Sequence, residues 1–252
     1  MYPFIHIFGF EIESYLVLYV IAFIVATFLL RHELKRNDYP PYLYIVLLIT
    51  AVITGMIGSK IYYLFEVWDS FIMSPAETFF NLAGSGWYGG FILAGVSIAA
   101  LLKIKKFPVL KTLDVIIPVL PLTQAIGRIG CFLAGCCHGS PADVPWAMSF
   151  PRGLYPPDVK VHPTQLYEIL IYLCVFVLLW TLRKKEIKYG IKAGLYLILA
   201  GLGRFIVEFY RLNPKVVFRL TAPQIIALSG AILGVVIILL CLRRASRRAN
   251  FY

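Results

Sequence analysis

Two arginines lie within apolar stretches of the chain, and each stands in a patterned run. Arg128 belongs to residues 127–132 (Gly-Arg-Ile-Gly-Cys-Phe), and Arg204 belongs to residues 203–208 (Gly-Arg-Phe-Ile-Val-Glu). A charged side chain at the centre of a bilayer costs at least about 2.5 kcal/mol and therefore requires a partner. The planar fork of donors on a guanidinium suits a phosphate group. Because lipid headgroups are the most common phosphates in a membrane, both arginines are candidates for binding a phospholipid.

Each arginine also has a purely structural interpretation. Arg128 could pair with a carboxylate, such as Glu66 or Glu208, and so hold two helices together. Arg204 and Glu208 are four residues apart, so on a helix they lie on one face and can pair with each other. The glycines that precede Arg204 would let a second helix or a ligand approach closely, which favours a binding site. The sequence alone leaves both interpretations open.

Three further positions carry groups that could contact an anion or a proton. Lys60 lies in an apolar stretch, where it either contacts a phosphate or extends toward the interface. Residues 84–90, which include Tyr88, are rich in glycine; their N–H groups favour an anion at a helix start, unless the segment is only a hinge. His162 precedes a predicted helix start that Thr164 is expected to cap. His162 is either active in proton transfer or a positioning residue.

Three of the five cysteines, Cys131, Cys136 and Cys137, lie close together in the sequence. Their spacing does not match the common zinc motifs. Three interpretations remain: small packing residues, a disulfide or redox pair between Cys131 and one of the other two, and a metal ligand or nucleophile. We predict no metal site and no cofactor. Cys174 and Cys241 lie in apolar runs and are expected to be ordinary packing residues.

The composition predicts the environment in which these residues act. The chain has 252 residues, of which 60% are hydrophobic, and its mean hydropathy is +0.80. Soluble domains are only about 45–50% apolar. We therefore expect an all-α polytopic membrane helical bundle. The net charge of +11 arises from short basic tracts between apolar stretches, a pattern that indicates contact with anionic membrane lipids and not with nucleic acid.

Seven apolar segments are long enough to cross a bilayer, which requires about 20 residues. The predicted transmembrane helices are residues 12–30, 42–66, 86–102, 112–133, 164–182, 191–210 and 222–242. The first segment lacks a preceding basic region and a following small-residue cleavage site, so we expect a retained span and not a signal peptide. We expect one integral membrane domain over residues 1–252.

Basic residues are unevenly distributed among the predicted connecting segments. Four segments hold 16 of the 24 lysines and arginines: 31–36, 103–111, 183–192 and 243–248. The segments that alternate with them hold only 5: 68–85, 134–162 and 211–220. Short cytoplasmic loops are enriched in Lys and Arg. We therefore predict that the N-terminus is outside and the C-terminus is cytoplasmic, with an odd number of spans.

The segment 134–163 differs from the other connections. It contains six prolines together with Trp146, Phe150 and Tyr155. Proline at this density does not suit a membrane span, and aromatic residues favour the membrane interface. We therefore expect an irregular, proline-rich arm on the outer, periplasmic side.

Five of these runs, taken in order, resemble the prolipoprotein diacylglyceryl transferase family of bacterial inner membranes. They are Tyr15 with its neighbours, the run Trp87-Tyr88-Gly89-Gly90, and residues 127–139, 162–168 and 203–211. At the last four of these runs, the family has the motifs aromatic-His-Gly-Gly, G-R-x-G-N-F-x-N-x-E-x-x-G, H-P-[ST]-Q-L-Y-E and R-x-x-V-E-F-x-R. The matching runs extend over nearly the whole chain, and their combination is specific although no single run is.

The resemblance implies a reaction and a set of site residues. Such enzymes transfer the diacylglyceryl group of phosphatidylglycerol to the lipobox cysteine thiol of a prolipoprotein, which forms a thioether and releases glycerol phosphate. The implied partners are phosphatidylglycerol, the prolipoprotein signal peptide with its lipobox, and other membrane lipids. The candidate catalytic residues are Arg128, Arg204 and Tyr88. The candidate substrate-binding residues are Arg128, Tyr15, Lys60, Gly89, Gly139, Glu208 and His162.

The chain departs from the family pattern at several of these positions. Tyr88 replaces the histidine that is usually assigned as the base, and Cys131 and Cys136 replace the signature asparagine and glutamate. Ala134 replaces the second asparagine, and Lys60 stands where the family often has arginine. A phenol, whose pKa is about 10, is a poor general base at pH 7.

These departures leave two alternatives to the transferase. One is a related membrane enzyme with another lipid or acceptor, or with a redox role for its cysteines. The other is a lipid-binding protein or an anion transporter with an arginine-lined path. The sequence shows no internal repeat, which gives little support to an inverted-repeat transporter.

Overall fold

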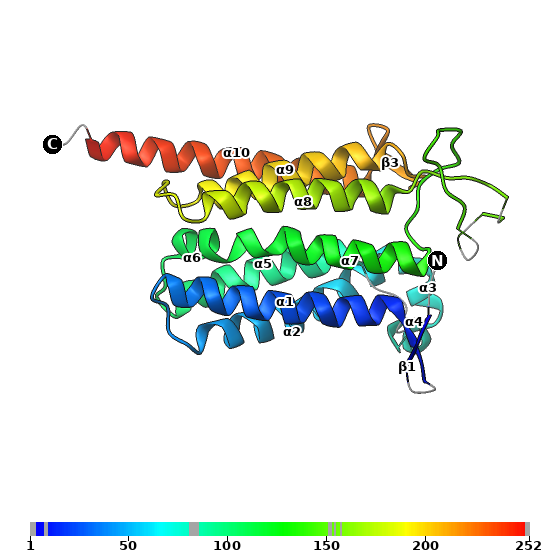
Figure 1. Cartoon of the computed structure of the whole chain (residues 1–252), viewed down its shortest axis with the longest axis horizontal. Coiled ribbons are helices and arrows are strands. Elements are labelled where there is room, and N and C mark those ends of the chain that lie inside the picture. Colours follow the sequence, from blue (N-terminus) through cyan, green and yellow to red (C-terminus); the bar gives the residue numbers. More distant parts are fainter. Residues whose placement is uncertain are drawn as a thin grey trace. The chain divides into compact units, whose positions relative to one another are not determined.

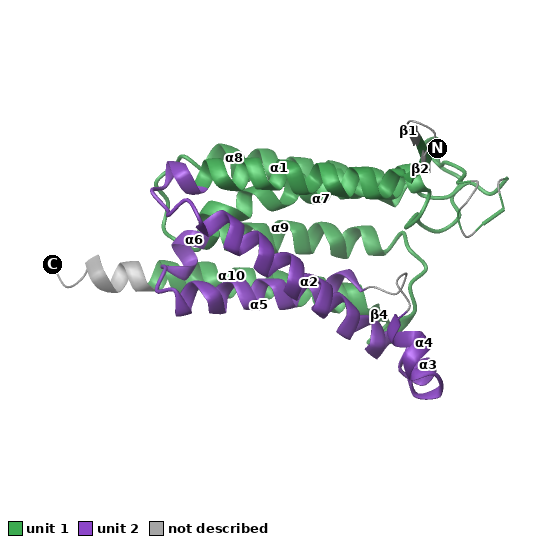
Figure 2. Cartoon of the chain, turned by 90° about the horizontal axis from the view of Figure 1, so that it is seen from below, with its two compact units in different colours: residues 1–33, 113–252 green, residues 34–112 purple. Residues whose placement is uncertain are grey.

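The computed structural model describes residues 4–7, 10–80, 86–150, 153, 155–156 and 158–249, and these are mostly helical (Figure 1). Contacts divide the chain into two compact units (Figure 2). Unit 1 comprises residues 1–33 and 113–252, and unit 2 comprises residues 34–112. Arg128 and Arg204 both lie in unit 1, so one unit carries the two predicted phosphate-binding arginines.

Unit 1 contains most of α1 and the helices of the C-terminal half. Its helices are α1 (Ser14–Arg36), the 3-10 helix η1 (Ile117–Val119), α7 (Leu120–Ala134), α8 (Thr164–Leu182), α9 (Ile191–Glu208) and α10 (Ala222–Ala249). Two antiparallel hairpins accompany them, β1 (Phe4–Ile7) with β2 (Phe10–Glu13), and β3 (Lys215–Val217) with β4 (Leu220–Thr221). Helix α8 packs on α7 and α9, and α9 packs on α10; α8, α9 and α10 lie side by side in Figure 1.

Unit 2 is built around a pair of long helices. Its helices are α2 (Leu43–Glu66), α3 (Trp68–Met73), α4 (Pro75–Phe80) and α5 (Trp87–Ile104), and α6 (Val109–Ile116) leads from it into unit 1. Helices α2 and α5 make most of the contacts within this unit.

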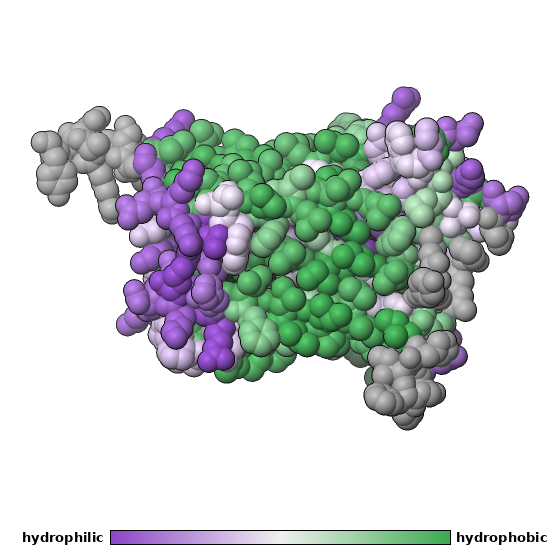
Figure 3. Space-filling model, in the orientation of Figure 1, coloured by the Kyte–Doolittle hydropathy of each residue, from purple (hydrophilic) through white to green (hydrophobic). Residues whose placement is uncertain are grey.

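The helices confirm a polytopic helical membrane protein. Among the described residues, six helical segments have the length and apolar composition to cross a membrane: Ser14–Arg36, Leu43–Glu66, Trp87–Ile104, Val109–Ala134, Thr164–Leu182 and Ala222–Arg243. Figure 3 shows that apolar side chains cover the helices along most of their length, whereas hydrophilic side chains gather toward helix ends. This surface is suited to hydrocarbon.

The seventh predicted span corresponds to α9, which differs from the other six in composition. It carries three charged residues, Lys192, Arg204 and Glu208, and all three are buried. An apolar helix exposed to lipid would not tolerate this number of charges. The charged residues of α9 are buried within unit 1, where the helix packs on α8 and α10, whereas Leu202 and Ile206 of the same helix are exposed. The total number of crossings and the orientation of the termini stay predictions.

The described residues between α7 and α8 form an irregular segment. Its described residues form no helix, and their main regular feature is a pair of antiparallel bridges from Val161 to Pro141 and to Met148. Gly135 and Cys137 adopt positive φ angles of 78° and 64°. These two left-handed residues turn the chain sharply as soon as α7 ends.

The crossing of α2 and α5 in unit 2 depends on glycine. A Cβ atom built on Gly58 would overlap the carbonyl oxygen of Gly89 and would lie 2.7 Å from Cβ of Leu93. One on Gly89 would overlap the carbonyl oxygen of Gly58. The two backbones therefore approach more closely than any larger side chain allows.

Gly58→Ala is expected to lower the free energy of unfolding by about 1–3 kcal/mol, because the added methyl forces the two helices apart. Gly95→Ala in α5 is the matched control, since a Cβ there meets nothing within 4 Å. The control should be neutral or more stable by up to about 1 kcal/mol. Thermal unfolding of the full chain in detergent measures both. Equal stabilities of the two variants would contradict the tight crossing.

Candidate active site

Both predicted arginines converge on one carboxylate, that of Glu168. Nε of Arg128 in α7 lies 2.7 Å from Oε2 of Glu168 in α8. Nη1 of Arg204 in α9 donates to Oε1 of the same carboxylate at 3.0 Å. One glutamate therefore joins three helices of unit 1 through two ion pairs. The structural interpretation of Arg128 named Glu66 or Glu208 as its partner, and the partner observed is Glu168.

A second carboxylate, that of Glu208, continues the network. Nη2 of Arg204 lies 2.7 Å from Oε2 of Glu208, which is the pair that their spacing on one helix face allows. Oε1 of Glu208 accepts hydrogen bonds from Nδ2 of Asn213 at 2.5 Å and from Oγ1 of Thr221 at 2.9 Å. Oε1 of Gln224 in turn accepts from the backbone N–H of Thr221 at 3.0 Å.

The network is electrically balanced, with two guanidinium groups and two carboxylates. Glu168 and Glu208 are each 2% exposed and Arg204 is 9% exposed, whereas the Arg128 side chain is 19% exposed. A buried ion pair requires such compensation because desolvation of each charge is expensive. Arg128 is thus the member of the network that a ligand can reach most easily.

The Cys131, Cys136 and Cys137 thiols, which we call the three-thiol cluster, meet at the end of α7. Their three Sγ atoms all lie within 4.8 Å of one another, and all five cysteines of the chain are free. Nη1 of Arg128 lies 3.9 Å from Sγ of Cys131. The cluster therefore lies directly beside the most accessible arginine. Cys174, which we expected to pack, is instead exposed on the surface of α8.

The start of α8 holds the backbone of the three-thiol cluster. Nε2 of Gln165 donates to the carbonyl oxygen of Cys136 at 2.7 Å, and Oγ1 of Thr164 donates to that of Cys137 at 2.9 Å. Both donors are fully buried. The prediction that Thr164 caps α8 is therefore wrong, because its hydroxyl is engaged by the preceding loop and Pro163 occupies the cap position.

The thiols beyond α7 differ in their acidity. Hydrogen bonds from Cys131 and Cys136, together with the charges of Arg128 and Arg211, lower the pKa of the Cys137 thiol from its ordinary value. Hydrogen bonds to Cys131 and Cys137, together with burial, raise the pKa of Cys136. The first thiolate to form in this group is therefore stabilised by both neighbouring sulfurs.

His162 and Gly139 lie where the arm meets α8. Nδ1 of His162 is 3.0 Å from the hydroxyl of Tyr167, and its ring lies 4.9 Å from that of Tyr210. The backbone N–H of Gly139 donates to the carbonyl oxygen of His162 at 2.8 Å. A Cβ on Gly139 would overlap the carbonyl oxygen of Tyr210, so only glycine fits there. These contacts tie both residues to the junction between the arm and α8.

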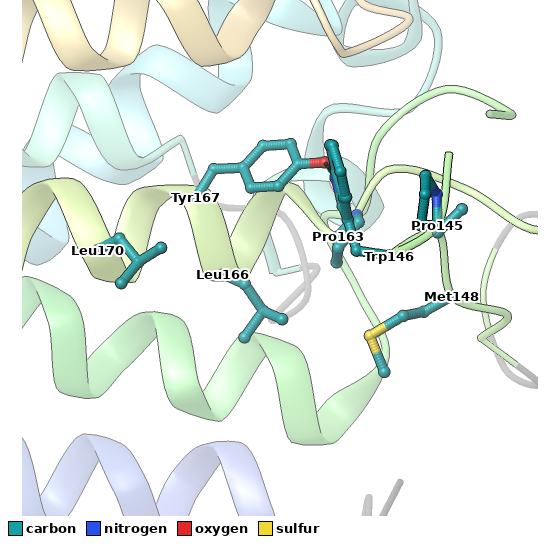
Figure 4. Close-up of a pocket in the computed structure, with 8 residues that line it drawn as sticks. Pro145, Trp146, Met148, Pro163, Leu166, Tyr167 and Leu170 are labelled. Carbon is teal, nitrogen blue, oxygen red and sulfur yellow. Dashed lines mark hydrogen bonds between the residues drawn. The ribbon is translucent and has the colours of Figure 1, made fainter. Parts of the chain in front are cut away.

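An open cavity of about 510 Å³ lies between the arm and the first turns of α8. It is lined mainly by apolar atoms from Pro145, Trp146, Ala147, Met148, Pro163, Leu166, Tyr167 and Leu170 (Figure 4). Nε1 of Trp146 donates to the hydroxyl of Tyr167 at 2.7 Å, which ties the arm to the helix. This hydroxyl also contacts His162, so the aromatic wall of the cavity continues into the arm–helix junction.

Tyr15 begins α1 beside α7. A Cβ built on Gly130 would lie 3.4 Å from Cδ2 of Tyr15, so the glycine lets the two helices approach. The ring of Tyr15 stacks on Tyr19 with centroids 6.5 Å apart, and its side chain is 44% exposed. The structure therefore places Tyr15 next to the helix that carries Arg128, with a surface still available to a ligand.

The remaining candidates belong to unit 2. Nζ of Lys60 donates to the carbonyl oxygen of Thr78 at 3.5 Å and lies 5.1 Å from the centroid of the Tyr63 ring. The Tyr88 ring contacts the rings of Tyr62 and Trp87, with centroids 6.2 and 5.3 Å away. Gly89 forms part of the α2–α5 crossing, as described above. Gly84 and Ser85 of the glycine-rich run lie outside the described residues.

Sequence reasoning missed Glu168 as the centre of the site. Glu168 is the fifth residue of the predicted span 164–182. The signal was available, because an acidic residue inside an apolar span requires a partner just as an arginine does. No comparable signal marked Asn213, Thr221 or Gln224, which are uncharged polar residues in the connection after α9 and in the first turn of α10.

Known proteins resemble the chain over most of its length. A family model described as prolipoprotein diacylglyceryl transferase matches residues 3–240. A phosphatidylglycerol–prolipoprotein diacylglyceryl transferase of Clostridium tetani is 37% identical over 234 residues, which cover 91% of this chain and 93% of the relative. Similar enzymes of Clostridium perfringens and Mannheimia succiniciproducens are each 34% identical; the alignments cover 83% and 95% of this chain and 82% and 92% of these relatives.

Glu168→Gln is expected to lower the free energy of unfolding by about 3–5 kcal/mol, because it leaves two buried guanidinium groups with one carboxylate. Glu186→Gln, at an exposed position after α8, is the matched control and should change stability by less than about 0.5 kcal/mol. Unfolding of the full chain in detergent measures both values. A Glu168→Gln protein as stable as the control would show that the ion pairs do not hold the helices.

Proposed function

The chain belongs to the prolipoprotein diacylglyceryl transferase family, and we propose that it transfers the diacylglyceryl group of phosphatidylglycerol to the lipobox cysteine thiol of prolipoproteins. The reaction forms a thioether and releases glycerol phosphate. The membrane in which it acts is the bacterial inner membrane, and residues 1–252 form one functional membrane domain.

The convergence of Arg128 and Arg204 on Glu168 is the observation that carries this proposal. The reaction breaks a bond between carbon and a phosphate oxygen, so negative charge builds up on the leaving phosphate. Donors that are already oriented in a site shielded from water stabilise such charge strongly. Glu168 fixes both guanidinium groups before the lipid binds, and Arg128 presents the more accessible one.

The other residues of the network and of the arm support this site. Glu208 orients Arg204 and is itself held by Asn213 and Thr221. His162 and Gly139 shape the junction between the arm and α8, and Tyr15 lies beside α7. In this proposal the lipid phosphate binds Arg128 and Arg204. The supporting residues named above hold the structure around the two arginines.

Lys60, Gly89 and Tyr88 are proposed as site residues on the motif match alone. Lys60 would contribute a positive charge, and Gly89 would allow the close approach of α2 and α5 next to Tyr88. Tyr88 would act as a hydrogen-bond donor and not as a base, because its phenol is neutral at pH 7.

Incubation of the purified chain with phosphatidylglycerol and a lipobox peptide tests the proposed function. The expected result is a peptide whose mass has increased by one diacylglyceryl group and that resists hydroxylamine, as a thioether does and a thioester does not. A peptide in which serine replaces the lipobox cysteine is the control. Absence of the added mass with an intact, folded chain would refute the proposal.

Arg128→Lys is expected to reduce transfer by at least about 100-fold, because lysine keeps the charge but loses the fork that engages Glu168 and a phosphate together. Arg243→Lys, at an exposed position near the end of α10, is the matched control and should keep the wild-type rate. The rate of peptide lipidation measures both. A rate for Arg128→Lys equal to that of the control would exclude a role for this guanidinium in the reaction.

Tyr88→Phe is expected to reduce the rate of transfer by about five- to tenfold, the effect of removing one neutral hydrogen bond worth about 1 kcal/mol. The ring contacts with Tyr62 and Trp87 are retained in this variant, so stability should be unchanged. Kinetics with the lipobox peptide, together with a melting curve, separate the two effects. An unchanged rate would show that the hydroxyl has no part in the reaction.

A further inference from the structure

The three-thiol cluster has the composition and spacing of a metal site. Four-coordinate zinc binds thiolates at about 2.3 Å, which places the sulfur atoms about 3.8 Å apart. The three Sγ atoms of Cys131, Cys136 and Cys137 lie within 4.8 Å of one another, so rotations of these short side chains reach that spacing. Soft thiolate ligands select Zn²⁺ over hard cations such as Mg²⁺ and Ca²⁺.

We propose that Cys131, Cys136 and Cys137 bind one Zn²⁺ ion, and that the fourth position of this ion takes the thiolate of the acceptor cysteine. This inference rests on the proposed function, and it names the group that activates the acceptor. It also accounts for a chain in which tyrosine occupies the position of the family's usual base. Three protein ligands and one open position are typical of catalytic zinc.

The backbone around the cluster is fixed before any ion binds. Gly135 and Cys137 in the left-handed region fold residues 136 and 137 back toward Cys131, and the N–H of Cys136 donates to the Cys131 carbonyl oxygen at 3.1 Å. Gln165 and Thr164 hold the carbonyl oxygens of residues 136 and 137. A site whose ligands are already in place loses little conformational entropy on binding.

The charges around the three-thiol cluster and the exposure of one of its cysteines also favour metal binding. Three thiolates around one divalent cation carry a net negative charge, and the Arg128 guanidinium lies beside Cys131 to balance it. Cys131 is buried whereas Cys136 is exposed, so the cluster is closed on one side and open on the other. His138 does not belong to this group of ligand atoms, and its buried ring stacks on Phe150.

The fourth position gives the ion a chemical role. A thiol that coordinates zinc loses its proton, here to water. The bound sulfur then forms a bond to the glyceryl carbon of phosphatidylglycerol while the bond from this carbon to the phosphate oxygen breaks. The electron pair of that bond leaves with the oxygen. The products are the thioether and glycerol phosphate. The glycerol phosphate carries both negative charges, that of the original thiolate and that of the lipid phosphate.

Metal binding by the full chain in detergent is the first test. The reduced protein should bind one Zn²⁺ per chain, and with Co²⁺ in its place should show a thiolate-to-metal charge-transfer band. Cys136→Ser should weaken Zn²⁺ binding by at least about tenfold, while Cys174→Ser, which alters a cysteine outside the cluster, should bind as the wild type does. Equal binding by the two variants overturns the proposal, as does the absence of binding by the reduced wild type.

The second test uses the acceptor. Addition of the lipobox peptide to the Co²⁺-loaded chain should change the charge-transfer band, and the serine-containing peptide should not; an unchanged spectrum with the cysteine peptide overturns the proposal. Removal of zinc with a chelator should reduce lipidation of the peptide at least tenfold, and Zn²⁺ should restore it. Full transfer by the metal-free chain overturns the zinc inference but leaves the proposed function standing. A correct spectral response without transfer at any metal concentration supports the zinc site and refutes the proposed function.

Discussion

Two positive charges buried among apolar helices must be neutralised within the protein, because hydrocarbon offers them no counter-charge. Glu168 meets this requirement for both Arg128 and Arg204 with its two carboxylate oxygens. Since these residues come from α7, α8 and α9, the electrostatic requirement also fixes the arrangement of three helices in unit 1. Glu208 completes the balance, and the hairpin after α9 holds Glu208 in turn.

The same balance explains how a structural network can serve a reaction. Arg204 is committed on two sides to carboxylates, whereas Arg128 is joined to Glu168 through Nε and is the more exposed of the two. Under the proposed function, a lipid phosphate at Arg128 would meet donors whose orientation Glu168 already fixes. Folding has already ordered the two guanidinium groups. In the proposed reaction they therefore need little reorganisation when negative charge develops on the leaving phosphate.

Two of the departures from the family pattern, at Cys131 and Cys136, lie beside this network. Two of the signature positions are cysteines here, and with Cys137 they form a cluster whose nearest cation is Arg128. The carboxylate and the amide that the family has at these positions are hard ligands and hydrogen-bonding groups. The cysteines of this chain replace them with soft thiol ligands. The change in side-chain chemistry at these two positions is confined to the end of α7, where the three thiols meet.

Much of the architecture follows from the sequence because a bilayer restricts a chain to few solutions. Length and hydropathy predict the helices, proline density predicts the irregular arm, and the four-residue spacing predicts the pair of Arg204 with Glu208. The partner of Arg128 could not be predicted in this way, since Glu168 is 40 residues away in sequence and meets it only when α7 packs on α8.

What the sequence by itself determined is thus the set of helices, the buried charges and the need to pair them. Only the tertiary structure decided which carboxylate serves both arginines and that Cys131, Cys136 and Cys137 meet at one point. The physical reason is that hydrophobicity and helical periodicity are local properties, whereas ion pairs and sulfur–sulfur distances depend on the packing of helices and on two left-handed residues in a turn.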